Sequence, residues 1–374
     1  MHRQYYVDRT GYGQTKDEQA YQNGAGDSGS PDQGRKDIKP MYVLGLDGGG
    51  TKTDVLLLPY EKKGGEKQKG QEESKKQEEP LLRFLVGGIN YNSFSREEIR
   101  MHVGQIRDGL TEAGYSLRGC AGVGIGAAGI SNPEAGPFLE EVFQSCGFDC
   151  PIRIVGDDEA ALIGGIGEGP GLLLIAGTGS VCLGQDRAGR RFRAGGFGHL
   201  IDDGGSAYAI ACDMLRAIVR ASDGRGPETM LKEAVFSSMG ISSVQELIAF
   251  LYAKKTGKKE IAALARLLTE DMVSKDTAAR EITRKAAKEL AELTAAVAAG
   301  LGAGGDLTVR GDLAAGSGAG DDYPLLLEGS VLLKNRFVRE ALIAELKVKS
   351  IPVCVTDKKA DAAYGAASMM RRTG

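Results

Sequence analysis

A short glycine-rich segment has the residue types needed to hold a phosphate group. It reads Asp47, Gly48, Gly49, Gly50, Thr51, Lys52 and Thr53. Successive glycines allow backbone N–H groups to converge on an anion without obstruction by a Cβ atom. The threonine hydroxyls add donors, and Lys52 adds a positive charge. Asp47 would repel phosphate unless a cation lay between them, and a carboxylate can hold hydrated Mg²⁺ against polyphosphate oxygens. The segment therefore predicts a phosphate site with Asp47 at a metal ion, although its spacing is not that of a Walker loop.

A second segment, Gly177, Thr178, Gly179 and Ser180, follows the same logic. It also lies between two apolar runs, at 172–176 and 181–183, so strand, glycine turn and strand occur twice in the chain. By itself such a turn is common in hairpins. Paired with the first segment, it predicts a second phosphate contact from the other half of the protein.

An acidic pair could serve a reacting hydroxyl group. Asp157 and Asp158 follow the apolar run 152–155 and open a predicted helix. A carboxylate at that place can accept a hydroxyl proton during phosphoryl transfer, but aspartate also caps helices. The spacing alone decides neither between these roles nor between the two residues.

Polar residues among glycines predict a pocket for a molecule with several hydroxyl groups. Asp202 and Asp203 follow the glycine-rich segment 195–199, which contains His199. Asn90 ends another apolar run and offers both a donor and an acceptor. For His199 a structural hydrogen bond is the alternative to catalysis.

The length of 374 residues suits two domains. Apolar runs at 41–46, 55–58, 81–86, 121–128 and 152–155 alternate with helical patterns at 95–113 and 134–146, which indicates an α/β domain. Ser95 and Glu98 have capping-box spacing. A second series has strands at 171–176, 181–184, 325–327 and 351–355, with helices at 207–300, 337–346 and 360–370. We predict a disordered leader at 1–40, an N-terminal α/β domain at 41–165 with a charged insert at 61–79, and a C-terminal domain at 166–358.

Composition excludes several classes of protein. The net charge of −3 supports neither a nucleic-acid nor a membrane partner. No apolar stretch approaches the roughly 20 residues of a membrane span, and the N-terminus lacks the apolar core of a signal peptide. The six cysteines form no CxxC pair and no cluster with zinc spacing, as expected for a cytoplasmic protein.

Five segments, taken in order, resemble the BadF/BadG/BcrA/BcrD ATPase family, and within it the N-acetylglucosamine kinase group of the actin/hexokinase/Hsp70-like superfamily. They are GLDGGGTKT at 45–53, GDDEAAL at 156–162, AGTGS at 176–180, GGFGHLIDDGGSAY at 195–208 and LLLEGSVLLKN at 325–335. The resemblance extends from about residue 41 to the C-terminus, without the charged insert. It implies two ribonuclease-H-like ATPase domains, of the actin-like fold, around a central cleft, at 41–165 and 166–358. It also implies that the final helix, 359–372, packs back on the first domain.

The resemblance also implies roles for the matching residues. In the family's aspartate motif the catalytic acid stands five residues before an aliphatic residue, which is Leu162 here. The resemblance therefore favours Asp157 as the catalytic base. Sugar-binding positions fall on Asn90, Ser180 and Asp203, and the adenosine side of ATP falls on Gly329 and Ser330. The implied activity is ATP- and Mg²⁺-dependent phosphorylation of an amino sugar, and a homodimer is consistent with the family.

Four residues at the expected sugar-binding segments depart from the family pattern. Phe197 replaces a tryptophan, Asp202 replaces a glycine, Gly204 replaces an acid, and Val181 replaces an asparagine. Missing polar partners can change substrate choice by orders of magnitude, so glucosamine and N-acetylmuramic acid stay open beside N-acetylglucosamine. Two other readings are an ATPase that activates a 2-hydroxyacyl-CoA dehydratase or benzoyl-CoA reductase through a cysteine-bound cluster, and a non-catalytic sugar sensor.

Overall fold

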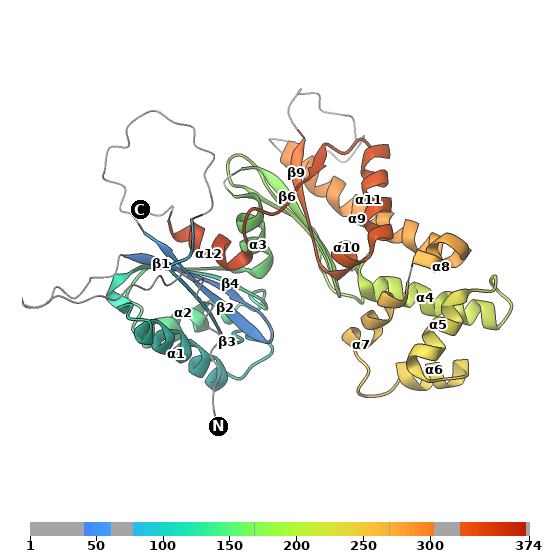
Figure 1. The fold of residues 1–374 in the computed structure, drawn as a ribbon, viewed down its shortest axis with the longest axis horizontal. Coiled ribbons are helices and arrows are strands. Elements are labelled where there is room, and N and C mark those ends of the chain that lie inside the picture. Colours follow the sequence, from blue (N-terminus) through green and yellow to red (C-terminus); the bar gives the residue numbers. More distant parts are fainter. Residues whose placement is uncertain (1–40, 61–77, 168, 269, 303–321, 372–374) are drawn as a thin grey trace, which may run out of the picture. The chain divides into compact units, whose positions relative to one another are not determined.

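A computed structural model describes residues 41–60, 78–167, 169–268, 270–302 and 322–371 (Figure 1). The chain divides into two compact units, Met1–Asp157 with Ala366–Gly374, and Asp158–Gly365. The predicted leader and nearly all of the predicted charged insert lie outside the described residues. The functional domains at 41–165 and 166–358 remain a prediction, as does the central cleft.

The first unit is built on a five-stranded mixed sheet with the order β3-β2-β1-β4-β5. Strand β1 pairs antiparallel with β2 and parallel with β4, and β4 pairs parallel with β5. The strands are β1 Tyr42–Gly48, β2 Lys52–Pro59, β3 Leu82–Gly87, β4 Cys120–Ala127 and β5 Ile152–Gly156. All five were predicted from apolar runs.

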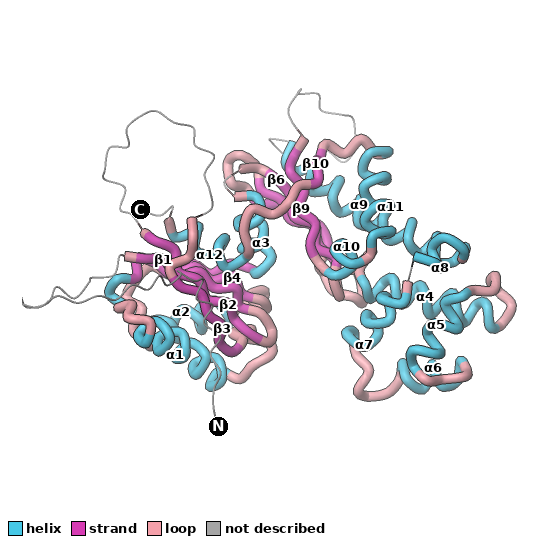
Figure 2. The backbone as a smooth tube through the Cα atoms, in the orientation of Figure 1, coloured by secondary structure: helices cyan, strands magenta, loops and turns pink. Residues whose placement is uncertain are grey.

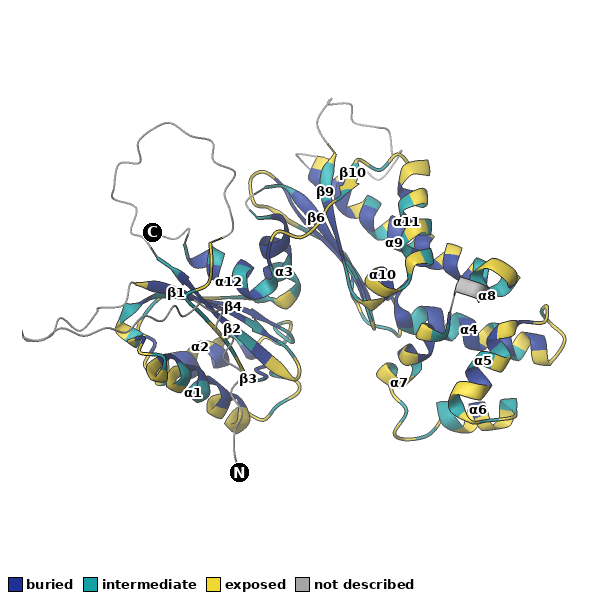
Figure 3. Cartoon of the chain, in the orientation of Figure 1, coloured by how far each residue is buried: buried dark blue, intermediate teal, exposed yellow. Residues whose placement is uncertain are grey.

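Two helices cover one face of this sheet. Helix α1, Arg96–Glu112, begins with the predicted capping box, in which Ser95 and Glu98 satisfy each other's backbone N–H groups. The short helix η1, Leu117–Gly119, precedes β4, and α2, Ala135–Ser145, follows it. Their apolar faces share one buried core with alternate residues of the strands, as the dark residues of Figure 3 indicate.

The other face of β4 receives the C-terminal helix. Side chains alternate along a strand, so Val123 and Ile125 enter the core under α1 and α2 while Gly122 and Gly124 face the opposite side. A Cβ atom on Gly124 would lie 1.9 Å from the carbonyl oxygen of Ala366, in helix α12, Ala362–Met370. Glycine is therefore required where this helix crosses the strand.

The second unit repeats the same sheet. Its order is β10-β9-β6-β7-β8, again with antiparallel pairs on one side of the first strand and parallel pairs on the other. The strands are β6 Gly171–Ala176, β7 Ser180–Gln185, β8 Arg191–Gly195, β9 Tyr323–Glu328 and β10 Val353–Val355. The predicted α/β fold with two ribonuclease-H-like sheets is confirmed. Strand β8 was not predicted, because an edge strand carrying Arg191 and Arg193 has no apolar run.

Helices lie on both faces of the second sheet. Leu172 and Leu174 enter the large core formed with the long helical segment, whereas Leu173 packs with Leu162 on the opposite side. Leu162 belongs to α3, Asp157–Ile166. Helices α10, Ser330–Lys334, and α11, Arg336–Val348, follow β9.

The predicted helical segment between β8 and β9 is confirmed and consists of several helices joined by short loops (Figure 2). They are α4 Ala207–Ser222, α5 Met230–Met239, α6 Val244–Leu251, α7 Lys258–Ala262, η2 Ala263–Leu267, α8 Glu270–Lys275 and α9 Thr277–Gly302. Among the described residues no single helix has the length and hydropathy to cross a membrane; α5 and α6 pass that test only as a pair bent by 60°.

Candidate functional site

The first glycine segment forms the turn of the β1–β2 hairpin. Gly48 is paired with Thr53, and the N–H of Gly49 donates to the carbonyl oxygen of Lys52 at 3.0 Å. Gly50, Thr51 and Lys52 are exposed. Thr53 is fully buried and its hydroxyl donates to the carbonyl oxygen of Gly87 at 2.9 Å. The hydroxyl predicted to meet phosphate at position 53 is therefore engaged with β3.

Asn90 lies beside this turn. A Cβ atom on Gly48 would lie 2.5 Å from the side chain of Ile89, and one on Gly88 would lie 2.8 Å from the carbonyl oxygen of Gly49. These close approaches hold the loop after β3 against the turn. The Asn90 amide nitrogen is 3.8 Å from the position of a Cβ on Gly50, and its Oδ1 accepts from the N–H of Asn92 at 2.9 Å.

The two predicted acids, Asp47 and Asp157, belong to the same edge of the first sheet. Parallel strands β1, β4 and β5 end in register, with Gly48 paired to Ala127 and Ala127 paired to Gly156. Asp47 is half-buried near the end of β1, and Asp157 is exposed directly after β5. The carboxyl ends of parallel strands are where α/β proteins bind ligands, so this edge gathers the glycine turn and both carboxylates.

Asp158 is engaged elsewhere. Its Oδ2 forms an ion pair with Nη1 of Arg193 at 3.0 Å, and its Oδ1 accepts from the N–H of Glu159 at 2.8 Å. Both partners lie in the second unit. Asp158 is therefore tied to the second unit, and which of the two acids takes part in chemistry stays a prediction.

The second glycine segment is the turn of the β6–β7 hairpin, at the place in its sheet that matches the first turn. The N–H of Gly177 donates to the carbonyl oxygen of Gly179 at 2.9 Å, and Thr178 is exposed. Gly329 lies against this hairpin, because its Cβ would be 2.3 Å from the carbonyl oxygen of Ala176. Ser330, the next residue, begins α10. The adenosine motif and the second turn are thus brought together within the second unit.

The two sugar-site residues predicted in this unit, Ser180 and Asp203, contact each other. Ser180 is 3% exposed and Asp203 is 2% exposed. The N–H of Ser180 donates to Oδ1 of Asp203 at 3.2 Å, and its hydroxyl donates to the carbonyl oxygen of Gly204 at 2.7 Å. Asp203 also forms an ion pair with Lys258 at 2.6 Å. Lys258 comes from α7, and no pattern in the sequence pointed to it.

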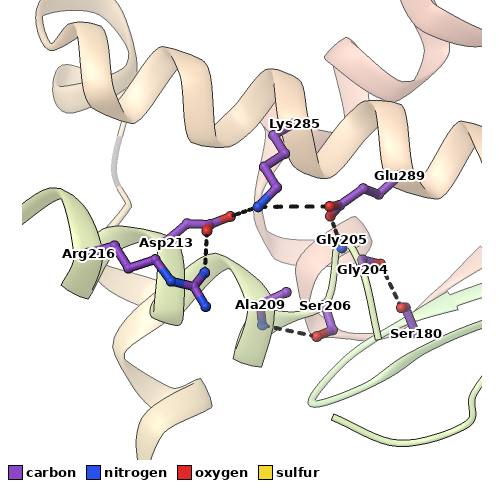
Figure 4. Close-up of polar contacts among 9 residues, drawn as sticks. All are labelled: Ser180, Gly204, Gly205, Ser206, Ala209, Asp213, Arg216, Lys285 and Glu289. Carbon is purple, nitrogen blue, oxygen red and sulfur yellow. Dashed lines mark hydrogen bonds and ion pairs between the residues drawn. The ribbon is translucent and has the colours of Figure 1, made fainter. Parts of the chain in front are cut away.

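Glu289 was also missed by the sequence analysis. Its Oε2 accepts from the N–H of Gly205 at 2.7 Å (Figure 4). Burial raises the pKa of Glu289, with further rises from Asp213 and Glu292, against the lowering effects of Lys285 and the Gly205 N–H. A half-buried carboxylate therefore lies against the loop that contains Asp203.

The glycine-rich segment before this loop exposes a large apolar surface. Phe197 is 68% exposed, and Leu200 and Ile201 are exposed as well. The His199 ring meets Tyr208 edge-on, with 4.8 Å between ring centroids. The aromatic contact supports the structural reading of His199.

Each unit therefore contributes one set of predicted site residues. The first holds Asp47, residues 48–53, Asn90 and Asp157; the second holds residues 177–180, Asp203, Gly329 and Ser330. Among the residues the structure describes, no group of three or more His, Cys, Asp or Glu could hold a metal ion by itself.

The chain is similar to known sugar kinases in sequence and in fold. The chain is 34% identical over 250 residues, 67% of this chain and 76% of the relative, to a Clostridium acetobutylicum protein named N-acetylmuramic acid/N-acetylglucosamine kinase. It is 28% identical over 270 residues, 69% of this chain and 80% of the relative, to the N-acetyl-D-glucosamine kinase of Dictyostelium discoideum. A crystal structure of a candidate N-acetylglucosamine kinase from Chromobacterium violaceum shares the fold, with a TM-score of 0.62 and 22% identity over 89% of this chain and 99% of that one.

A family model matches residues 44–369, a range that includes all five predicted motifs and both sheets except the first two residues of β1. The chain belongs to the BadF/BadG/BcrA/BcrD ATPase family.

Proposed function

We propose that the chain is an ATP-dependent sugar kinase that phosphorylates an amino sugar, namely N-acetylglucosamine or a close relative such as glucosamine or N-acetylmuramic acid. The observation that carries the proposal is the repeated hairpin. The same glycine turn joins the first two strands of two sheets with identical strand order, in a chain whose relatives are named as kinases of these sugars.

In this proposal the two turns bind the phosphates of ATP. Residues 48–52 and 177–179 supply backbone N–H groups, which suit phosphate oxygens because no side chain obstructs them. Thr53 contributes to the hairpin rather than a hydroxyl to the phosphate. Gly329 and Ser330, which lie against the second turn, would face the adenosine.

Mg²⁺ fits the acids of the first sheet. Magnesium is held in kinases by one or two carboxylates together with substrate phosphates, and not by an all-protein cage. A single half-buried carboxylate beside a phosphate turn, as at Asp47, meets that requirement. When bound, the ion would neutralise charge on the phosphate oxygens.

Asp157 would act as the general base. The hydroxyl oxygen of the sugar forms a bond to the γ-phosphorus, and the bond from that phosphorus to the β–γ bridging oxygen breaks. The hydroxyl proton passes to the Asp157 carboxylate, and ADP leaves. The exposure of Asp157 directly after β5 supports this assignment.

Asn90, Ser180 and Asp203 would form part of the sugar site. Because Ser180 and Asp203 are almost fully buried, their contribution includes holding the shape of the loop at 202–206. Asn90 lies beside the first turn with its amide nitrogen near Gly50.

The dehydratase-activator reading gains no support from the cysteines. Cys120 is 6% exposed, and its Sγ lies 3.6 Å from Sγ of Cys150 inside the first unit. Such a contact turns the two thiols toward each other rather than toward a surface cluster.

The test measures sugar-stimulated ADP release over a panel of amino sugars and hexoses, with Asp157→Ala and Asp158→Ala as a matched pair. Loss of a general base slows turnover by about 10²–10⁴-fold, so Asp157→Ala should lose turnover while retaining ATP binding. Asp158→Ala should retain activity. Absence of stimulation by every sugar would contradict the kinase, and full activity of Asp157→Ala would contradict the base.

A further inference from the structure

One loop of the second unit, residues 202–206, is held from two sides. On one side, Asp203 accepts the N–H of Ser180, and Gly204 accepts the Ser180 hydroxyl. On the other side, the N–H of Gly205 donates to Glu289 at 2.7 Å. Figure 4 shows the Ser180–Gly204 and Gly205–Glu289 contacts, which join the start of β7, the loop and helix α9. The loop therefore links the second glycine hairpin to α9.

The glycines of this loop allow it to press against α9. Gly205 has a φ of +75°, and a Cβ atom on it would lie 2.5 Å from the side chain of Leu290 and 2.8 Å from the carbonyl oxygen of Ala286. A Cβ atom on Gly204 would lie 3.1 Å from the carboxyl carbon of Glu289. The Glu289 carboxylate thus occupies the space directly beside the loop backbone.

The Glu289 carboxylate lies closer to the Gly205 N–H than to its nearest cation. Lys285, one turn earlier on α9, lies 3.9 Å from Oε1 of Glu289 but only 2.8 Å from Asp213. Asp213 also pairs with Arg216 at 2.7 Å. The cation nearest to Glu289 is therefore held mainly by another acid, and the carboxylate is left to accept from the Gly205 N–H.

We propose that Glu289 is a positioning residue that fixes the 202–206 loop and thereby sets the affinity for the sugar acceptor. The inference rests on the proposed sugar kinase activity and on Asp203 belonging to the sugar site. Without Glu289, the Gly205 N–H loses its acceptor, and the backbone that carries Asp203 and Gly204 is free to move away from Ser180. The loop also adjoins the second glycine turn, since the N–H of Ala207, directly after the loop, donates to the carbonyl oxygen of Gly177 at 2.8 Å.

The test uses the full chain with the sugar that gives the highest turnover. Glu289→Ala should raise the KM for the sugar about tenfold or more, the loss expected for one hydrogen bond to a charged group. The KM for ATP should rise by a smaller factor, because the second turn adjoins the loop but keeps its own hydrogen bond between Gly177 and Gly179. Glu289→Gln should restore the sugar KM nearly to that of the wild type, because its amide oxygen can accept the same N–H.

Two further variants serve as matched controls. Glu292→Ala removes an exposed acid from the same helix and should leave both KM values unchanged. Lys285→Met removes the cation and spares the loop contact, so its sugar KM should also stay within about twofold if the hydrogen bond decides the effect.

Three results would overturn the inference: an unchanged sugar KM in Glu289→Ala, an equal rise of the sugar and ATP KM values, or a Gln variant as impaired as the Ala variant. The last result would mean that the negative charge itself is needed. A wild-type protein that phosphorylates no sugar contradicts the proposed function instead, and circular dichroism of each variant identifies any that fails to fold. If Glu289→Ala fails to fold, Glu289→Gln alone decides, because the proposal requires its sugar KM to match that of the wild type.

Discussion

Replacing Gly329 by alanine should disturb the second glycine hairpin. Gly329 has φ +90° and ψ 155°, a conformation that is essentially restricted to glycine. A Cβ atom there would lie 2.3 Å from the carbonyl oxygen of Ala176 and 2.8 Å from the backbone nitrogen of Gly177. Both atoms belong to the hairpin backbone, so no rotation of a side chain can relieve the clash.

Two terms set the expected loss. The backbone conformation costs about 1–3 kcal/mol for a residue other than glycine. Forcing packed backbone apart adds about 1–3 kcal/mol, as overpacking does in a core. We therefore expect Gly329→Ala to lower the free energy of unfolding by about 4 kcal/mol. Gly224 is the matched control, because it has φ +80° but no atom within 4 Å of its Cβ position. Gly224→Ala should cost only about 1–2 kcal/mol.

The assay compares urea unfolding of the two variants with the wild type by far-UV circular dichroism. Nucleotide binding is then measured with a non-hydrolysable ATP analogue. Gly329→Ala should bind the analogue more weakly, because relief of the clash would displace the backbone of Gly177 in the proposed phosphate turn. Gly224→Ala should bind it as the wild type does. If the two variants lose equal stability, the close approach of Gly329 to β6 is not rigid and the reasoning fails.

Three further outcomes follow from named contacts. Lys258→Met leaves the buried Asp203 without its cation and should lower the free energy of unfolding in urea by about 2 kcal/mol. This is less than for a fully buried pair, because the Lys258 side chain is 29% exposed. Adding Asp203→Asn should restore most of that loss, and no recovery would contradict the pairing. Burial raises the pKa of Glu289 above its ordinary 4.5, so the stability that the protonated form contributes is lost as the pH rises through the raised pKa. The urea midpoint of Glu289→Gln should therefore increase relative to that of the wild type as the pH rises from about 4 to about 7. A difference between the two midpoints that does not change with pH would refute this. Diamide should oxidise Cys120 and Cys150 to an intramolecular disulfide, since their sulfurs lie 3.6 Å apart; mass spectrometry of peptides would find no such link in Cys150→Ser.

Local patterns predicted most of the fold. The apolar runs gave the strands of both sheets except β8, and the spacing of Ser95 and Glu98 gave the start of α1. These signals are local, because a strand or a cap is specified by residues that are neighbours in the chain. Strand β8 was missed because its outward residues are arginines and it lies at an edge.

The two glycine turns were also predicted, since a turn follows from the residue types themselves. Their binding of phosphate stays a prediction. The partners of those residues were not predicted. Thr53 was predicted to offer a hydroxyl to phosphate, but that hydroxyl is engaged by Gly87, 34 residues further on. The choice between Asp157 and Asp158 was open by spacing and stays a prediction, and the ion pair of Asp158 with Arg193 had no signal in the sequence.

By itself, then, the sequence determined the α/β class, the two glycine turns and the family, because each of these depends on short segments whose chemistry is complete within the segment. Only the tertiary structure decided how charge is distributed around the proposed sugar site. Lys258 contacts Asp203, which is 55 residues earlier in the chain, and Glu289 contacts Gly205, which is 84 residues earlier. Such approaches depend on how helices pack on a sheet, and no local pattern of residues encodes which side chain will arrive there.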